Sequence, residues 1–240
     1  MPFNLLSIII PIYNEDKIVA ESLPLIFNLD LPKEIIIVND GSTDQTLSVL
    51  NDLSKKYNYT LINQVTNQGK GAAIKLGLEN INGDYFIICD ADLEYNPSDI
   101  IKLWETAKNY AKELNEKPGK EQEINNVAFY GSRFLNKAPR SFHSLVNWSL
   151  TFLTNILFGG NLSDMETCFK LIPATALKNI KLKGKRFEIE PEITAQLLKN
   201  NFKIKEIAIS YNKRGYKEGK KIKARDGLMA IKTLIKERFN

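Results

Sequence analysis

The chain has 240 residues, of which 43% are hydrophobic and 25% are charged. These proportions are ordinary for a soluble globular protein, and they exclude a disordered or fibrous chain. The length suits one large domain, or two small ones, with a substantial core.

The sequence gives no sign of a membrane span or a secretory leader. No apolar run reaches the roughly 18 residues that a membrane-spanning helix needs. The N-terminus has no basic region before its first apolar run, so we expect no signal peptide. Both cysteines, Cys89 and Cys168, sit in apolar runs without metal-ligand spacing, so we expect buried, reduced thiols and a cytosolic compartment.

Positive charge is concentrated at the C-terminus. Residues 201–240 contain 12 Lys or Arg and four Asp or Glu, and because the whole chain carries only +5, the first 200 residues are net negative. Such an asymmetry suggests an anionic partner, such as a phosphate, a lipid headgroup or a nucleic acid, and a merely solvated basic tail is the equal alternative on charge alone.

The first 110 residues alternate between apolar runs of strand length and helical patterns. We expect strands at 5–12, 34–40 and 59–65 and in the apolar run before Asp90, with helices at 17–27, 44–56, 72–80 and 97–110. This alternation predicts an α/β fold with a mostly parallel, doubly wound sheet.

The second half is less regular. Residues 111–126 are mostly polar and are expected to form a surface loop. Beyond it we expect strands at 126–133, 164–172 and 202–211, and helices at 139–160, 188–200 and 224–238. The absence of a linker indicates a single domain, 1–240, whose C-terminal part elaborates the sheet.

The segment 139–160 is apolar on nearly all sides. Such a helix is either buried completely or in contact with lipid. The sequence leaves both alternatives open.

Three acids, Asp90, Asp92 and Glu94, follow the strand that ends near residue 89. Ligands of open α/β sheets collect beyond the carboxyl ends of the strands. Alternate carboxylates in this position can hold Mg²⁺ or Mn²⁺. The competing interpretation is a solvated turn before the helix that starts at Pro97.

Four short stretches carry a resemblance that spans most of the chain. They are 7–15 (SIIIPIYNE), 37–44 (IVNDGSTD), 67–71 (NQGKG) and 90–92 (DAD). In this order, each at a predicted strand end, they resemble the signature of family-2 inverting glycosyltransferases with the GT-A (Rossmann-like) fold. The resemblance implies that residues 1–110 bind a nucleotide sugar and that residues 127–240, with the basic C-terminal helix, bind the acceptor.

Three later blocks narrow the resemblance. Residues 131–133, 164–170 and 187–192 are similar to those of dolichyl- and polyprenyl-phosphate hexosyltransferases. This implies a nucleotide-sugar donor of the GDP-mannose or UDP-glucose type, Mg²⁺ or Mn²⁺, and a polyprenyl-phosphate lipid acceptor. It also implies a cytoplasmic protein at the membrane face, held by peripheral contact or by a membrane-anchoring subunit, with no nucleic acid as partner.

The resemblance also implies roles for individual residues. The metal ligands would be Asp92 with Asp90 and Glu94, and Glu94 departs from the more usual glutamine. The residues that would line the nucleotide sugar are Pro11, Tyr13, Glu15, Val38, Asp40, Lys70, Asp90, Ala91 and Arg133. A tyrosine face can stack on a base, and carboxylates accept from its N–H groups or from ribose hydroxyls.

Phosphate binding is expected from Arg133 and from three residues of the basic tail, Lys220, Lys221 and Arg225. The catalytic set implied by the resemblance is Asp92, Arg133 and Asp164. A phosphate acceptor needs no strong base, whereas a hydroxyl acceptor does, and Asp164 is then the candidate.

Two alternatives stay open on the sequence. One is a family-2 enzyme that acts on a sugar hydroxyl of a cell-surface glycan. The other is a non-enzymatic nucleic-acid-binding domain that uses the basic tail, which leaves the strand-end acids without a purpose.

Overall fold

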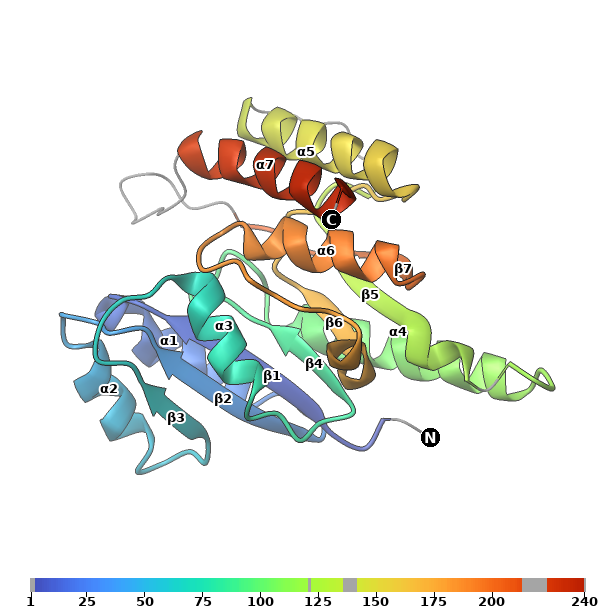
Figure 1. Cartoon of the computed structure of the whole chain (residues 1–240). Coiled ribbons are helices and arrows are strands. Elements are labelled where there is room, and N and C mark those ends of the chain that lie inside the picture. The colour runs from blue at the N-terminus through green and yellow to red at the C-terminus, as the bar shows by residue number, and fades with distance from the viewer. Residues whose placement is uncertain (1–2, 121, 136–141, 213–223, 240) are drawn as a thin grey trace.

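Seven strands form one sheet (Figure 1). The computed structural model describes residues 3–120, 122–135, 142–212 and 224–239. The strands are β1 (Leu6–Ile12), β2 (Lys33–Asn39), β3 (Thr60–Asn63), β4 (Tyr85–Ile88), β5 (Val127–Ser132), β6 (Lys170–Pro173) and β7 (Lys203–Ala208). Their order is β3-β2-β1-β4-β6-β5-β7. Only β6 runs antiparallel to its neighbours, which confirms the mostly parallel sheet.

Helices cover both faces of the sheet (Figure 1). They are α1 (Asp16–Phe27), α2 (Thr46–Leu53), α3 (Lys70–Leu78), α4 (Ser98–Asn115), α5 (Phe142–Phe158), α6 (Ile189–Lys199) and α7 (Ala224–Phe239), with short 3₁₀ helices η1 (Glu123–Asn126) and η2 (Ala174–Lys178). Helices α3 and α6 lie on one face, and α1 and α4 lie on the other. No described helix is long and apolar enough to cross a membrane.

The core is built from the continuous apolar runs of the central strands. Ile8, Ile9 and Ile10 of β1 are fully buried, and α3 approaches this strand closely. A Cβ on Gly77 would lie 2.5 Å from Cγ2 of Ile9, so only glycine permits this packing distance. Both cysteines are buried and unbridged, as predicted.

The predicted surface loop at 111–126 is wrong at both ends. Helix α4 continues to Asn115, because Ala111 and Leu114 extend its buried stripe while the charged residues between them face solvent. Near the other end, η1 buries Ile124. The predicted strand at 164–172 also begins later, at Lys170, because Asp164 and the residues after it fold into polar contacts instead of a ladder.

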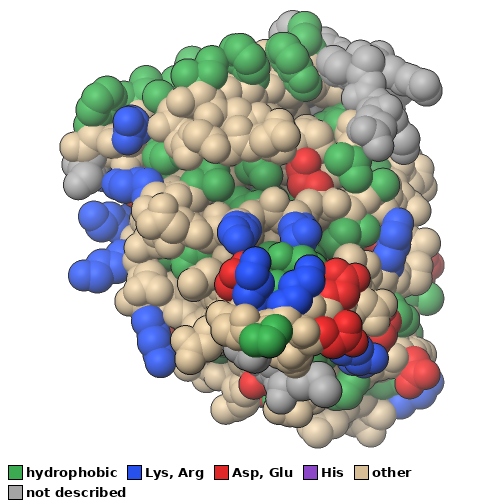
Figure 2. Space-filling model, turned by 90° about the vertical axis from the view of Figure 1, so that its right-hand side faces the viewer, with side chains coloured by type: hydrophobic (Ala, Val, Ile, Leu, Met, Phe, Trp, Pro, Cys, Tyr) green, Lys and Arg blue, Asp and Glu red, His purple; other side chains and the backbone are tan. Residues whose placement is uncertain are grey.

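Helices α5 and α7 form an outer layer that rests on α6 (Figure 1). The predicted helical segment 139–160 is one helix in its described part. Figure 2 shows hydrophobic side chains along the top edge of the molecule, where this layer lies. Several apolar residues of α5 are therefore on the surface, and complete burial of this helix is wrong.

Candidate active site at the carboxyl edge of the sheet

The candidate site lies where β1, β2 and β4 end. These strands are parallel, so the residues that follow them gather at one edge of the sheet. Tyr13 and Glu15 come after β1, Asp40 after β2, and Asp90 after β4. The sequence prediction that these residues share one rim is therefore confirmed by the topology.

Three of the residues expected around the nucleotide differ in burial, and their roles stay predictions. Val38 is fully buried and packs in a small cluster with Ile36 and Ala73, so its side chain belongs to the core. Ala91 is also buried, whereas Pro11 is partly exposed on β1. Any contact of Val38 with a ligand would have to come from its backbone.

The loops after β1 and β2 are joined by side-chain hydrogen bonds. Asn14 adopts a φ of +50°, and its backbone N donates to Ser42 Oγ at 3.0 Å. Its Oδ1 accepts from the N of Thr43 at 2.8 Å, and the N of Glu15 donates to Thr46 Oγ1 at 2.9 Å. Ser42, Thr43 and the nearby Thr46 therefore fix the loop that carries Tyr13 and Glu15.

Asp40 is buried and holds the next loop in place. One of its carboxylate oxygens, Oδ1, accepts from the backbone N of Gln68 at 2.8 Å, and the other, Oδ2, accepts from the N of Gly69 at 2.8 Å. The side chain of Asn67 also donates to Oδ2, at 2.9 Å. A role in reading a base edge stays a prediction, and it would require one of these bonds to be exchanged.

Glycines let a distant segment approach the start of α3. Gly69 has a φ of +101°, and a Cβ there would lie 2.4 Å from the carbonyl oxygen of Lys185. The same carbonyl accepts from the N of Ala72 at 3.1 Å. The pattern Gly-Lys-Gly is thus explained by close packing against residues 183–186.

Between these glycines, Lys70 lies in a partly buried network of alternating charge. Its Nζ is 2.9 Å from Oδ2 of Asp90 and 3.2 Å from Oε1 of Glu190. The other oxygen of Glu190 pairs with Lys170. Burial opposes the charge on Lys70, but the carboxylates of Asp90 and Glu190 raise its pKa, so it is protonated at neutral pH.

Glu190 was missed as a site residue by the sequence reasoning. It lies in the 187–192 block, whose similarity to the family assigned no role to this residue. Its side chain is only 4% exposed, and a buried glutamate is not expected from the sequence. The alternation of Glu with apolar residues at the start of α6 could have indicated it.

A second buried pair joins Arg133 and Asp164. Nε of Arg133 lies 2.7 Å from Oδ2 of Asp164, and Nη2 lies 2.7 Å from Oδ1. The backbone N of Arg133 adds a third bond, 2.9 Å to Oδ2. Because both oxygens of Asp164 accept from Arg133, this carboxylate orients the guanidinium, and it would have to leave the pair to act as a base.

Aromatic rings surround the Arg133 guanidinium. Its Cζ lies 5.8 Å from the ring centre of Tyr95, 5.3 Å from that of Phe134 and 5.1 Å from that of Tyr211. The ring faces attract the cation and keep water from it, so the side chain is held in one orientation.

The three acids after β4 do not converge as a triad. Oδ1 of Asp92 accepts from the N of Glu94 at 3.0 Å, across a turn in which Leu93 has a φ of +59°. Oε2 of Glu94 accepts from the hydroxyl of Tyr211 at 2.8 Å. Across the described residues, no group of three or more His, Cys, Asp or Glu side chains is arranged to hold a metal ion.

Asp90 and Asp92 nevertheless suit a metal ion whose remaining ligands come from the substrate. Both are partly exposed oxygen donors at the strand end, and Mg²⁺ is commonly bound by one or two carboxylates together with substrate phosphates. Glu94 accepts from the Tyr211 hydroxyl and Asp90 is paired with Lys70, and the metal-ligand roles of Asp90, Asp92 and Glu94 stay predictions.

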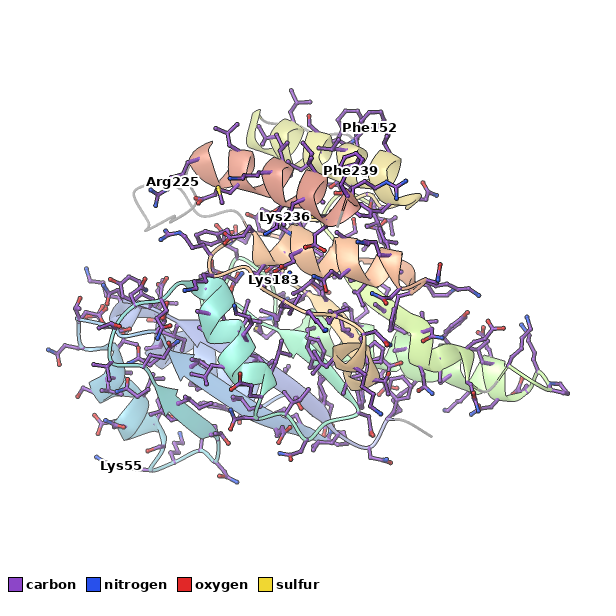
Figure 3. The ribbon with its side chains drawn as sticks, in the orientation of Figure 1. Lys55, Phe152, Lys183, Arg225, Lys236 and Phe239 are labelled. Carbon is purple, nitrogen blue, oxygen red and sulfur yellow. The ribbon has the colours of Figure 1, made fainter. Side chains whose placement is uncertain are left out.

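Of the tail residues predicted to bind phosphate, Lys220 and Lys221 lie outside the described residues. Arg225 is exposed at the N-terminal end of α7 (Figure 3). Among the described residues no contact joins Arg225 to the strand-end acids, and its role stays a prediction.

Glu166 is a partly buried residue whose carboxyl interacts with both charged pairs. Its Oε1 has no hydrogen-bond partner within the described part of the chain. Burial raises its pKa to about 7, and Glu190 and Asp164 add to this while Lys170 and Arg133 oppose it. The sequence reasoning did not single out this residue.

Glu166→Gln is expected to stabilise the protein at alkaline pH. The folded pKa of about 7 lies above the ordinary 4.5, so stability is lost as pH rises between these values. The variant removes this loss, and its free energy of unfolding should exceed the original by about 1–3 kcal/mol at about pH 8 and by little at about pH 5.

Urea unfolding at both pH values measures this difference. Glu113→Gln, on the exposed side of α4, is the control and should change little at either pH. An equal effect of Glu166→Gln at both pH values would refute the perturbed pKa.

Comparison with protein families gives one match that covers most of the chain. Glycosyl transferase family 2 matches residues 7–180. A dolichyl-phosphate beta-glucosyltransferase of Trichomonas vaginalis is 29% identical over 245 residues, which cover 96% of this chain and 72% of that protein. The dolichol-phosphate mannosyltransferase of Pyrococcus furiosus is 38% identical over 105 residues, which cover 43% of this chain and 30% of that protein.

Solved structures share the fold at low identity. Glucosyl-3-phosphoglycerate synthase from Mycobacterium tuberculosis in complex with uridine diphosphate has a TM-score of 0.68 at 15% identity, covering 98% of this chain and 80% of that one. S. aureus TarS 1–349 in complex with UDP-GlcNAc has a TM-score of 0.59 at 17% identity, and the match covers 97% of this chain and 66% of that one. The predicted GT-A fold is thereby confirmed.

Proposed function

Because the chain belongs to glycosyl transferase family 2, we propose that it transfers a hexose from a nucleotide sugar to a polyprenyl or dolichyl phosphate, with inversion. Membership makes the chain an enzyme, so the non-enzymatic alternative is wrong. Residues 1–110 would bind the donor and residues 127–240 the acceptor. A UDP-glucose-type donor is favoured over GDP-mannose, because the relative that aligns with 96% of this chain is a glucosyltransferase.

The observation that carries the proposal is the fixed guanidinium of Arg133. Asp164 binds it through two 2.7 Å contacts, and the pair is almost fully buried. Nε and Nη2 are used by Asp164, so the remaining N–H groups of the guanidinium would donate to the oxygens of a phosphate or diphosphate. Because both oxygens of Asp164 accept from Arg133, this carboxylate is not available as a base. This favours an acceptor that needs no general base.

A phosphate acceptor needs no general base. A phosphate monoester with a second pKa of about 6 is largely dianionic at neutral pH. One of its oxygens would attack the anomeric carbon while the bond from that carbon to the diphosphate oxygen breaks. The negative charge that grows on the departing nucleoside diphosphate would be stabilised by Arg133.

Asp92, together with Asp90, would hold Mg²⁺ or Mn²⁺ beside the donor. When bound, the ion supplies positive charge that stabilises the leaving diphosphate. Support comes from the Mycobacterium tuberculosis synthase, whose structure contains Mn²⁺ together with uridine diphosphate. Lys70 would keep Asp90 in position through their 2.9 Å ion pair.

A hydroxyl acceptor is the second candidate, and one observation favours it. Glu166, with a pKa raised to about 7 and one oxygen without a partner, is suited to remove a proton at neutral pH. On this alternative Glu166, in place of Asp164, would act as the base.

A partition assay distinguishes a lipid-phosphate acceptor from a hydroxyl acceptor. The protein is incubated with Mn²⁺, radiolabelled UDP-glucose or GDP-mannose, and a polyprenyl phosphate in detergent. We expect label in the organic phase, more from UDP-glucose than from GDP-mannose. Label that remains in water with every donor, although the protein binds those donors in equilibrium dialysis, would overturn the lipid acceptor; transfer to an oligosaccharide instead would support the second candidate.

A further inference from the structure

Helix α5 buries a mixed polar and apolar side and exposes an apolar stripe. The buried side chains of its described part are Ser144, Asn147, Leu150, Thr151 and Thr154. Those most exposed on the other side are Leu145, Trp148, Phe152 and Ile156, with exposures of 45% to 64%. The positions recur at helical spacing, so they form one stripe. Helix α5 therefore contributes Leu150 to the cluster that it shares with its neighbours, while a separate apolar stripe faces outward.

Helix α7 presents a similar stripe. Leu228, Ile231, Ile235 and Phe239 are exposed at three- and four-residue intervals, with exposures of 37% to 82%. On the opposite side Ala230 and Leu234 are buried in the cluster that α5, α6 and α7 share. The helix is therefore anchored by one apolar side and exposes another.

The two stripes belong to one layer of the molecule. Helices α5 and α7 pack against each other and both rest on α6 (Figure 1). In Figure 3, Phe152 of α5 and Phe239 of α7 lie at the same end of the layer. We call the eight exposed residues of the two stripes the outer face. Figure 2 shows hydrophobic side chains along this edge of the molecule.

The exposed charges of the described parts of α5 and α7 are all positive. Helix α7 exposes Arg225, Lys232, Lys236 and Arg238. Its two acids, Asp226 and Glu237, are only 8% and 7% exposed. The sequence of α5 contains no Asp, Glu, Lys or Arg. Spacings of seven and four residues place Arg225, Lys232 and Lys236 along one border of the apolar stripe of α7.

We propose that the outer face docks on the surface of an anionic lipid bilayer. Apolar residues on one side of a helix with Lys and Arg at their border are the pattern of helices that lie in a membrane interface. Trp148 and Phe152, whose rings stack with centres 5.6 Å apart, supply side chains suited to headgroup depth. A second copy of the chain, paired face to face, would bring the cationic borders together.

Sedimentation with vesicles tests this docking. The protein is mixed with vesicles of phosphatidylcholine alone or with phosphatidylglycerol, without polyprenyl phosphate or donor, so the result does not depend on the proposed function. We expect the protein to pellet with the anionic vesicles and to be released by salt. Failure to pellet with them would overturn the proposal.

Two double variants locate the contact. Phe152→Glu with Leu228→Glu, and Lys232→Glu with Lys236→Glu, should each weaken vesicle binding by about tenfold or more. All four side chains are exposed, so the fold should survive, which circular dichroism and urea unfolding verify. Binding equal to that of the original protein would refute the outer face as the contact.

Matched controls lie outside the outer face. Val65 is 95% exposed, and Lys55 lies on the far side of the sheet from α5 and α7 (Figure 3). Val65→Glu and Lys55→Glu should leave vesicle binding unchanged. If the original protein is instead a dimer in sizing experiments and Phe152→Glu makes it monomeric, the face is an interface between copies and the proposal is wrong.

Discussion

Asp92→Asn is expected to lower kcat/KM for hexose transfer by about a thousandfold while leaving the fold intact. The amide keeps the size of the side chain but loses the charge that a hard cation requires. It can still accept the 3.0 Å hydrogen bond from the N of Glu94, so the turn should persist. Loss of Mn²⁺ binding in the presence of UDP, followed by electron paramagnetic resonance, is the second readout.

The control for this variant lies on the same strand. Asp84 stands at the other end of β4, where its Oδ2 accepts from the backbone N of Asn4 at 2.8 Å. Asp84→Asn should retain transfer and Mn²⁺ binding. Unchanged Mn²⁺ affinity in Asp92→Asn would refute the assignment of this carboxylate as a metal ligand, whatever happens to the rate.

Asp164→Asn is expected to reduce the free energy of unfolding by about 3 kcal/mol or more. The change leaves the Arg133 guanidinium buried among aromatic rings without a counter-ion. Asp52→Asn makes the same chemical change in a pair of the same 2.7 Å length, but there the partners are 76% and 70% exposed. That control should cost less than about 1 kcal/mol. Urea unfolding measures both.

A paired replacement separates stability from chemistry. Arg133→Met combined with Asp164→Leu removes both charges and fills their space with apolar groups, which should recover most of the stability lost in Asp164→Asn. Hexose transfer should nevertheless be lost in the paired variant, because no guanidinium is left to stabilise the leaving diphosphate. Full activity in the paired variant would show that the buried ion pair is only structural.

Much of the N-terminal half could be predicted from the sequence because its signals are local. Apolar runs such as 5–12 and helical patterns between them define β1 to β4 without reference to distant residues. Polar residues at the ends of parallel strands must meet at one edge, so the position of the candidate site also followed from local patterns.

The second half was predicted less well, because tertiary contacts decide its structure. The charged residues around 112 suggested a loop, yet Leu114 found a buried position and prolonged α4. The state of Lys70 depends on Glu190, a residue 120 positions away that no local pattern connects to it. Likewise, only the folded chain showed that Asp164 is engaged by Arg133.

The close packing of residues 183–186 against the start of α3 bears on how the protein is made. The carbonyl of Lys185 accepts from the N of Ala72, and the Nζ of Lys75 donates to the carbonyl of Lys183 at 3.1 Å. These contacts span more than a hundred residues, so they close late as the chain leaves the ribosome. A nascent chain that ends before α6 would therefore carry Lys70 without Glu190, so the charge network around Lys70 would form only after residue 190 has been made.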